Sequence, residues 1–120
     1  MLIVGKTEQF VGRWFQDDGE ISMGTATAKF EIVDAGVRKY LQADLTTFSA
    51  TEATHALAFV AGIGWSMGVT IPLSAKGFTL AWTLLHSNVD LPPMTDSAYV
   101  TKHDSDVLKT AIEAMQGGLN

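Results

Sequence analysis

The side chains most suited to metal binding or acid–base chemistry are the histidines and the acidic residues close to them in sequence. His103 is followed directly by Asp104 and then by Asp106, and His86 stands four residues before Asp90. Imidazole and carboxylate groups bind divalent metal ions and exchange protons near neutral pH. If the two regions meet in the fold, they form one metal or acid–base site from two histidines and two carboxylates: His86, Asp90, His103 and Asp104.

The same residues have a purely structural explanation. The acids that follow His103 stand before an apolar segment of helical period, where carboxylates accept hydrogen bonds from the free amides of the first helical turn. His55 lies in a largely apolar stretch and is expected to be a partly buried structural residue. We favour this structural interpretation, so the sequence predicts neither a metal nor another cofactor.

Other catalytic and cofactor-binding signatures are absent from the chain or do not fit it. Gly62, Gly64 and Gly68 lack the spacing of a dinucleotide-binding loop, which must also follow a strand and precede a helix. Gly64–Gly68 has the letters Gly-x-Ser-x-Gly, but a nucleophile turn of that kind joins a strand to a following helix, which is not the order expected here. The absence of cysteine excludes a thiolate metal site and a cysteine nucleophile. The sequence therefore does not decide whether the chain is an enzyme, and it favours a non-enzymatic protein.

Two further polar groups remain open to either a binding or a structural interpretation. Arg38, Tyr40 and Asp44 share one face of an expected strand, which would suit an anion or a substrate hydroxyl. The outward side chains of a half-exposed sheet explain them equally well. The acidic run from Asp17 to Glu20 is too short for a calcium loop and is expected to be a hairpin turn.

Composition and charge narrow the partners. The chain has 120 residues, 13 of them acidic and 8 basic, for a formal net charge of −5, and 47% are hydrophobic. Binding to nucleic acid usually requires a basic patch, so nucleic acid and an anionic membrane surface are not expected as partners. The lack of cysteine and of a signal-peptide pattern at Met1–Lys6 predicts a cytoplasmic protein.

The first half of the chain has the pattern of strands. Four strands in two successive hairpins are expected between Leu2 and Leu45, with turns at Asp17–Gly19 and Asp34–Gly36. Phe30 and Ile32 alternate with polar neighbours, which is typical of a strand with one buried face.

The uncharged stretch between Glu52 and Lys76 is the most apolar part of the chain. Ser49–Glu52 has the form of a helix capping box, and apolar residues then recur at three- and four-residue spacing. We therefore expect a helix from Ser49 to about Gly64 and a short edge strand at Val69–Leu73. A membrane-spanning helix is disfavoured because polar residues, a proline and glycines interrupt the stretch.

The remaining elements complete an α+β prediction. A strand at Phe78–Leu84, a loop at His86–Asp96 and an amphipathic C-terminal helix at Asp104–Gln116 are expected. The whole chain, residues 1–120, is expected to form a single domain. Its fold would combine a mostly antiparallel sheet of about five to six strands with a middle helix and the C-terminal helix.

Two hypotheses for function follow from these elements. The first is a non-enzymatic protein-interaction or assembly module, which would be a homodimeric binding, chaperone-like, or viral or accessory structural subunit. Its expected partner is a second copy of itself, with another protein as the further alternative. Its contact is expected beside the joint between the middle helix and the edge strand, at Trp65, Met67 and Ile71. The alternative is a small enzyme or ligand-binding domain that uses the histidine and aspartate site described above.

Overall fold

The computed structural model describes residues 1–101, and the regular structure of this part is almost entirely strand. A single 3-10 turn, Leu73–Ala75, interrupts the strands. The ten strands of the described part are β1 (Thr7–Gly12), β2 (Phe15–Gln16), β3 (Gly19–Glu20), β4 (Ala26–Asp34), β5 (Val37–Leu41), β6 (Phe48–Ser49), β7 (His55–Val60), β8 (Gly64–Thr70), β9 (Thr79–His86) and β10 (Met94–Tyr99).

Strand β4 is the centre of the sheet because it has partners on both edges. One edge pairs with β9, so that Phe30 lies opposite Trp82. The other edge pairs first with β7, where Ala26 lies opposite Leu57, and then with β5 across the Asp34–Gly36 turn. Every ladder of the described strands is antiparallel, and β2 and β3 form a separate small hairpin.

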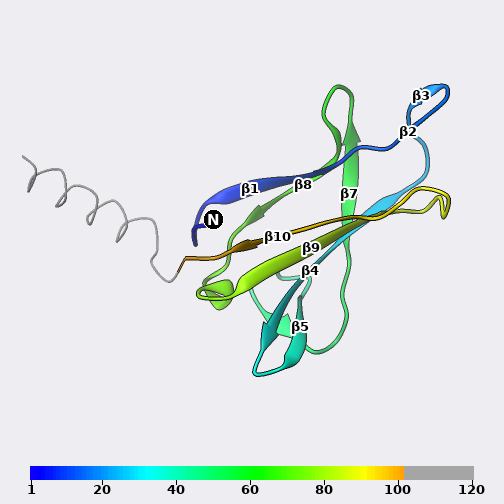
Figure 1. Ribbon diagram of the computed structural model, residues 1–120. Helices are drawn as coiled ribbons and strands as arrows, with labels where there is room; N and C mark the ends of the chain where they lie inside the picture. Colours follow the sequence, from blue (N-terminus) through cyan, green and yellow to red (C-terminus); the bar gives the residue numbers. More distant parts are fainter. Residues whose placement is uncertain (102–120) are drawn as a thin grey trace, which may run out of the picture.

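The sheet curves until its two edge strands nearly meet. Its order runs β10-β9-β4-β7-β8-β1, with β5 and β6 continuing from the second half of β4. A parallel bridge joins Leu2, which precedes β1, to Val100, which follows β10. Leu2 donates its amide to the carbonyl of Tyr99 at 2.7 Å, and Thr101 donates to Leu2 at 2.9 Å. The result is a nearly closed, barrel-like sheet (Figure 1).

The interior of this curved sheet holds the hydrophobic core. On β4 the inward residues alternate with outward ones, and Phe30 and Ile32 are buried as the sequence pattern indicates. Phe10 of β1 packs edge-on against both Phe30 and Trp82, with ring centroids 4.8 Å apart in each pair. These contacts join strands from opposite sides of the sheet, so the core is formed by one sheet packing on itself.

The prediction of a middle helix from Ser49 to about Gly64 is wrong. This region contains β6 and β7, and β7 pairs with β8 in a hairpin. The inward side chains of β7 are His55, Leu57 and Phe59, whereas Ala56 and Ala58 face outward. Alanine at the outward positions made the apolar residues fit a helical period as well as a strand period, so periodicity alone could not separate the two structures.

The turn and capping signals in this region serve strand structure instead. Gly62 adopts a φ of 81° in the β7–β8 turn, a left-handed conformation that glycine reaches without steric cost. Ser49 does accept a local hydrogen bond, but from the amide of Thr51 at 3.1 Å in a short turn. Glu52 forms an ion pair with Lys29 at 2.9 Å and thus lies against β4. Ser49 and Glu52, which the sequence suggested as a helix cap, therefore stabilise a turn and a contact with β4 instead.

The α+β assignment is wrong for the described part of the chain, because residues 1–101 contain no α-helix. The predicted C-terminal helix at Asp104–Gln116 lies outside the described residues. The segment predicted as an edge strand, Val69–Leu73, is also corrected: β8 ends at Thr70 and has partners on both sides, β1 and β7. No helix among the described residues has the length and apolar character needed to cross a membrane.

The alternation on β4 gives a direct test of the fold. Phe30 is fully buried, whereas Val33 on the opposite face is largely exposed. We expect Phe30→Ala to lower the free energy of unfolding by about 3–5 kcal/mol, and Val33→Ala to change it by less than about 0.5 kcal/mol. Urea denaturation followed by tryptophan fluorescence measures both. An equal loss of unfolding free energy in the two variants would contradict the placement of Phe30 and Val33 on opposite faces of β4.

Candidate functional site

Three aromatic side chains pack together at the end of the sheet opposite the Leu2–Val100 bridge. Trp14 follows β1, Trp65 lies in β8, and His86 ends β9. Both indole rings meet the imidazole edge-on, with centroid distances of 5.5 Å for Trp14 and 5.4 Å for Trp65. All three side chains are buried. We call Trp14, Trp65 and His86 the ring cluster.

The two tryptophans of the ring cluster bind loop backbone through their indole nitrogens. Trp14 donates Nε1–H to the carbonyl of Pro92 at 2.7 Å, in the connection between β9 and β10. Trp65 donates Nε1–H to the carbonyl of Ile21 at 2.9 Å, just after β3. Each indole thus anchors a loop that is distant in sequence, while its ring fills the end of the core.

The imidazole of His86 has both of its nitrogens occupied. The amide of Asn88 donates to Nδ1 at 2.9 Å, and Nε2 lies 2.9 Å from the carbonyl of Met23. An amide can only donate and a carbonyl can only accept, so the ring form that satisfies both bonds carries its hydrogen on Nε2. This leaves no ring nitrogen free to bind a metal ion.

Gly24 allows the chain to pass close to this imidazole. Its φ is 87°, and a Cβ atom added there would lie 2.9 Å from Cε1 of His86 and from Oγ of Ser87. Any larger residue would therefore combine a strained backbone with a steric clash. The amide of Ser87 donates to the carbonyl of Thr25 at 2.8 Å, which continues the attachment of this segment to the end of β9.

The loops held by the ring cluster carry large apolar side chains that face solvent. Phe15 is 60% exposed, Met23 is 80% exposed and Val89 is 95% exposed. Phe15 adjoins Trp14, and Val89 adjoins Asn88, so each apolar residue is fixed close to an anchored position. The β2–β3 hairpin and the β9–β10 connection lie at the same end of the molecule (Figure 1).

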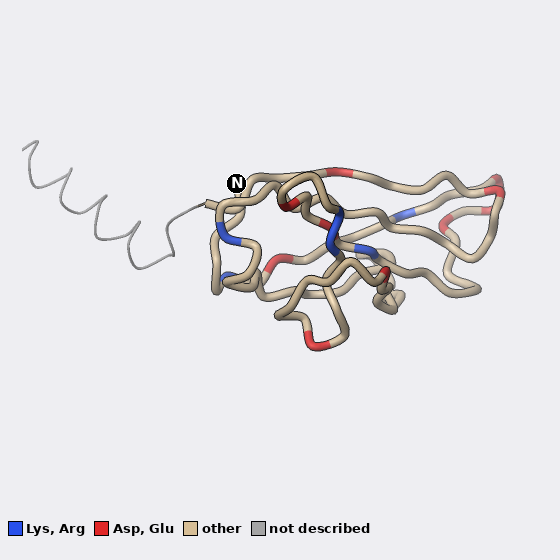
Figure 2. The backbone as a smooth tube through the Cα atoms, turned by 90° about the horizontal axis from the view of Figure 1, so that it is seen from below, with Lys and Arg blue, Asp and Glu red and all other residues tan. Residues whose placement is uncertain are grey.

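Acidic residues lie close in sequence to two of these apolar side chains. Asp17 and Asp18 form the β2–β3 turn, and Asp90 follows Val89. None of the three aspartates has an ion pair among the described residues, whereas Glu20 is paired with Arg13. Figure 2 shows acidic positions gathered at this end of the tube. We call the exposed set the loop-end surface: Phe15, Asp17, Asp18, Met23, Val89 and Asp90.

The residues predicted for a protein contact lie mostly in the interior. Trp65 is 5% exposed and Ile71 is 1% exposed, and Met67 is partly buried against the same core. A partner could reach Trp65 or Ile71 only if they left the interior. A charged substitution at either position would therefore test folding rather than association.

The metal site predicted from His86, Asp90, His103 and Asp104 stays a prediction, because the structure describes only the first two of these residues. No group of three or more histidine, aspartate or glutamate side chains in residues 1–101 is arranged to hold a metal ion. His86 serves the ring cluster and Asp90 the loop-end surface, while His103 and Asp104 lie outside the described residues. His55 binds the carbonyl of Leu41 through Nε2 at 2.9 Å and is the buried structural residue that the sequence indicates.

The strand face predicted to hold Arg38, Tyr40 and Asp44 is divided by the structure. Arg38 and Tyr40 lie on β5, but Asp44 lies in the turn that follows. The Asp44 carboxylate accepts hydrogen bonds from the amides of Thr46 and Thr47, each at 2.9 Å, and from the Thr47 hydroxyl at 2.8 Å. These bonds lower the pKa of Asp44 to about 2, because they stabilise the charged form. Asp44 therefore holds its own turn.

Comparison with known proteins adds no functional information. No family model, curated protein or solved structure matches this chain. The function must therefore be argued from the surface itself. The loop-end surface was not predicted, although a signal was present: Phe15, Met23 and Val89 are large apolar residues placed beside turn-forming residues, where polar side chains are usual.

Replacing His86 tests the ring cluster. His86→Phe keeps an aromatic ring but leaves the Met23 carbonyl and the Asn88 amide without partners, so we expect a loss of about 1–3 kcal/mol in the free energy of unfolding. Hydrogen exchange at the Asn88 amide should also become faster. His55→Phe, which removes a comparable buried bond elsewhere, is the control. Equal exchange at Asn88 in the two variants would show that His86 does not anchor the loop.

The Asp44 turn has a defined pH dependence. The carboxyl has a pKa of 3.8 when unperturbed and about 2 in the folded protein. Its contribution to stability is therefore complete above pH 3.8 and is lost as the pH falls towards 2. A carboxyl titration by NMR should give a midpoint near 2 for Asp44. In Thr47→Val, which lacks the hydroxyl donor, the midpoint should move upward; an unchanged midpoint would refute the hydroxyl's contribution.

Proposed function

We propose that the chain is a non-enzymatic protein-interaction module that binds its partner through the loop-end surface. The observation that carries this proposal is the exposure of Phe15, Met23 and Val89 on loops that the ring cluster holds in place. A large apolar side chain gains little from exposure to water, whereas its burial against a partner contributes about 1.5–3 kcal/mol.

The anchoring of these loops favours binding because it lowers the entropy cost of association. Disordered loops must be ordered when a partner binds, and that cost is subtracted from the interaction free energy. Here the Pro92 and Met23 carbonyls and the Asn88 amide are already bonded to buried rings. The loop-end surface thus has the form of a preorganised patch, with apolar anchors inside a polar rim.

Charge selects the class of partner. Asp17, Asp18 and Asp90 form no ion pair among the described residues. The cation that lies over the Phe15 ring, Arg13, is itself paired with Glu20, so the loop-end surface keeps an excess of negative charge. A two-fold contact between copies through this surface would place these carboxylates against one another, which costs free energy. The complementary partner is another protein that offers a segment with basic and apolar residues.

The proposed location of the protein is the cytoplasm. The chain has no cysteine with which to form disulfides, and this composition fits a reducing compartment.

Binding to defined peptides tests the proposal. We expect the protein to bind synthetic amphipathic peptides in which lysine or arginine alternates with leucine or tryptophan, and not the same peptides with glutamate in place of the basic residues. NMR shifts should appear at residues 15–20, 23 and 89–90. Affinity should fall with added salt, because the rim charges are exposed.

Two variants show whether the loop-end surface makes the contact. Phe15→Ser and Val89→Ser should each weaken peptide binding by about tenfold, since each removes an apolar anchor. Leu73→Ser is the matched control. Leu73 is also a large, exposed apolar residue (67%), but it lies on the 3-10 turn between β8 and β9 and is not part of the loop-end surface. Equal weakening by the control, or a dimer in sedimentation that Phe15→Ser abolishes, would overturn the proposal of a basic partner.

A further inference from the structure

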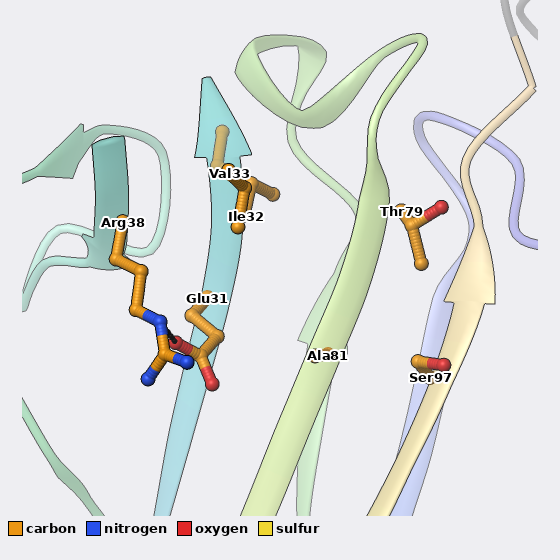
Figure 3. A pocket seen from close by; sticks show the side chains of 7 residues that line it. All are labelled: Glu31, Ile32, Val33, Arg38, Thr79, Ala81 and Ser97. Carbon is orange, nitrogen blue, oxygen red and sulfur yellow. Dashed lines mark ion pairs between the residues drawn. The ribbon is translucent and has the colours of Figure 1, made fainter. Parts of the chain in front are cut away.

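A separate hollow lies on the outer face of the sheet. It has a volume of about 490 Å³ and crosses strands β5, β4, β9 and β10 (Figure 3). This volume is within the range of small-molecule sites. The residues that line it are Glu31, Ile32, Val33, Arg38, Thr79, Ala81 and Ser97, of which Ile32 turns its side chain to the core.

The register of the strands explains why the surface is hollow here. Glu31 lies opposite Ala81, and Ala81 lies opposite Ser97, so the three residues form one row across β4, β9 and β10. Ala81 is the middle member of this row and has the smallest side chain. The larger side chains of Glu31 and Arg38 stand on one side of it, and the hydroxyls of Thr79 and Ser97 stand on the other (Figure 3).

One polar atom of the hollow lacks a partner. Oε2 of Glu31 is buried and has no hydrogen bond, and its nearest cation is Nε of Arg38 at 4.0 Å. The Arg38 side chain is largely exposed, so its remaining N–H groups can reach a ligand. Because Oε2 is buried, a ligand can reach the Glu31 carboxylate only through its other oxygen, Oε1. The hollow therefore offers one acceptor oxygen on Glu31, donors on Arg38, and hydroxyls that both donate and accept.

These groups exclude several classes of ligand. An anion would be attracted by Arg38 but repelled by Glu31, and a cation would be attracted by Glu31 but repelled by Arg38, so the two opposite charges disfavour a ligand with a net charge of either sign. The hollow is open to water, so an apolar ligand would gain little burial. A ligand that makes several hydrogen bonds of both senses at once is favoured instead.

We propose that this hollow is a binding site for a neutral carbohydrate, with a single sugar ring placed over Ala81. Sugar hydroxyls donate to Glu31, accept from Arg38 and exchange bonds with Thr79 and Ser97. Tyr99 does not line the hollow but lies directly opposite Thr79 on the same face and is exposed, so its ring is available to a sugar that extends past Thr79. The hollow is distinct from the loop-end surface, so this proposal does not depend on the protein-interaction function.

An NMR titration of the full chain tests the carbohydrate site. The probes are methyl α-D-glucopyranoside, methyl β-D-galactopyranoside and N-acetyl-D-glucosamine, with glycine and inorganic phosphate as charged comparisons. At least one sugar should shift the amides of Glu31, Ala81 and Ser97, with a dissociation constant of about 1 mM, typical of a few hydrogen bonds at an open site. Glycine and phosphate should leave them unchanged.

Variants of the hollow complete the test. Ser97→Ala should weaken sugar binding by about fivefold through the loss of one hydrogen bond. Ala81→Leu should abolish it by filling the hollow. Thr95→Ala is the control, because Thr95 is on the same face of β10 but does not line the hollow, and it should bind like the parent.

The outcomes separate the possibilities. If no sugar shifts these amides, or if Thr95→Ala weakens binding as much as Ser97→Ala, the site does not bind carbohydrate. If glycine or phosphate shifts the amides and the sugars do not, the hollow takes a charged ligand and the proposal is overturned. Loss of peptide binding at the loop-end surface would not bear on either result.

Discussion

The described chain has to bury the apolar face of a single sheet with no helix to cover it. A sheet in that position must pack on a second sheet or curve until its own face is enclosed. Here Phe10 of an edge region packs edge-on against Phe30 and Trp82 of the central strands. The Leu2–Val100 bridge then brings the outer strands together. The core, the location of both ends of the described segment and the exposed outer face all follow from this curvature.

The open end of such a sheet must be covered by loops, and the buried amide and carbonyl groups of these loops need hydrogen-bond partners. The ring cluster closes this end with three side chains that carry polar atoms at their edges. The indoles of Trp14 and Trp65 and the imidazole of His86 fill apolar space and also bind loop carbonyls. Buried polar atoms with full sets of partners favour one arrangement of the loops over others. Exposed apolar residues on those loops are therefore held in fixed positions.

The two candidate surfaces use opposite physical means of recognition. The loop-end surface presents large apolar side chains with an acidic rim, which suits a protein partner that buries them. The outer-face hollow is lined by small residues and by one weakly coupled Glu31–Arg38 pair, which suits a small polar ligand. Oε2 of Glu31 is buried without a hydrogen bond, and Nε of Arg38 lies 4.0 Å from it.

The amino-acid sequence by itself determined the local features. It located the Asp34–Gly36 turn and the strand alternation at Phe30 and Ile32, because turn chemistry and a period of two are local properties. It also determined the acidic charge, and it identified His55 as a structural residue.

Only the tertiary structure decided the conformation of the uncharged stretch. Ala56 and Ala58 fit a helix face and an exposed strand face equally well, so local pattern could not choose between them. Pairing with β4 and β8 made the choice, since β7 lies between two strands that require a partner there. The same holds for His86, whose neighbours Trp14 and Trp65 are distant in sequence. Its role depends on which rings the curved sheet brings together, and that information is not local to any segment.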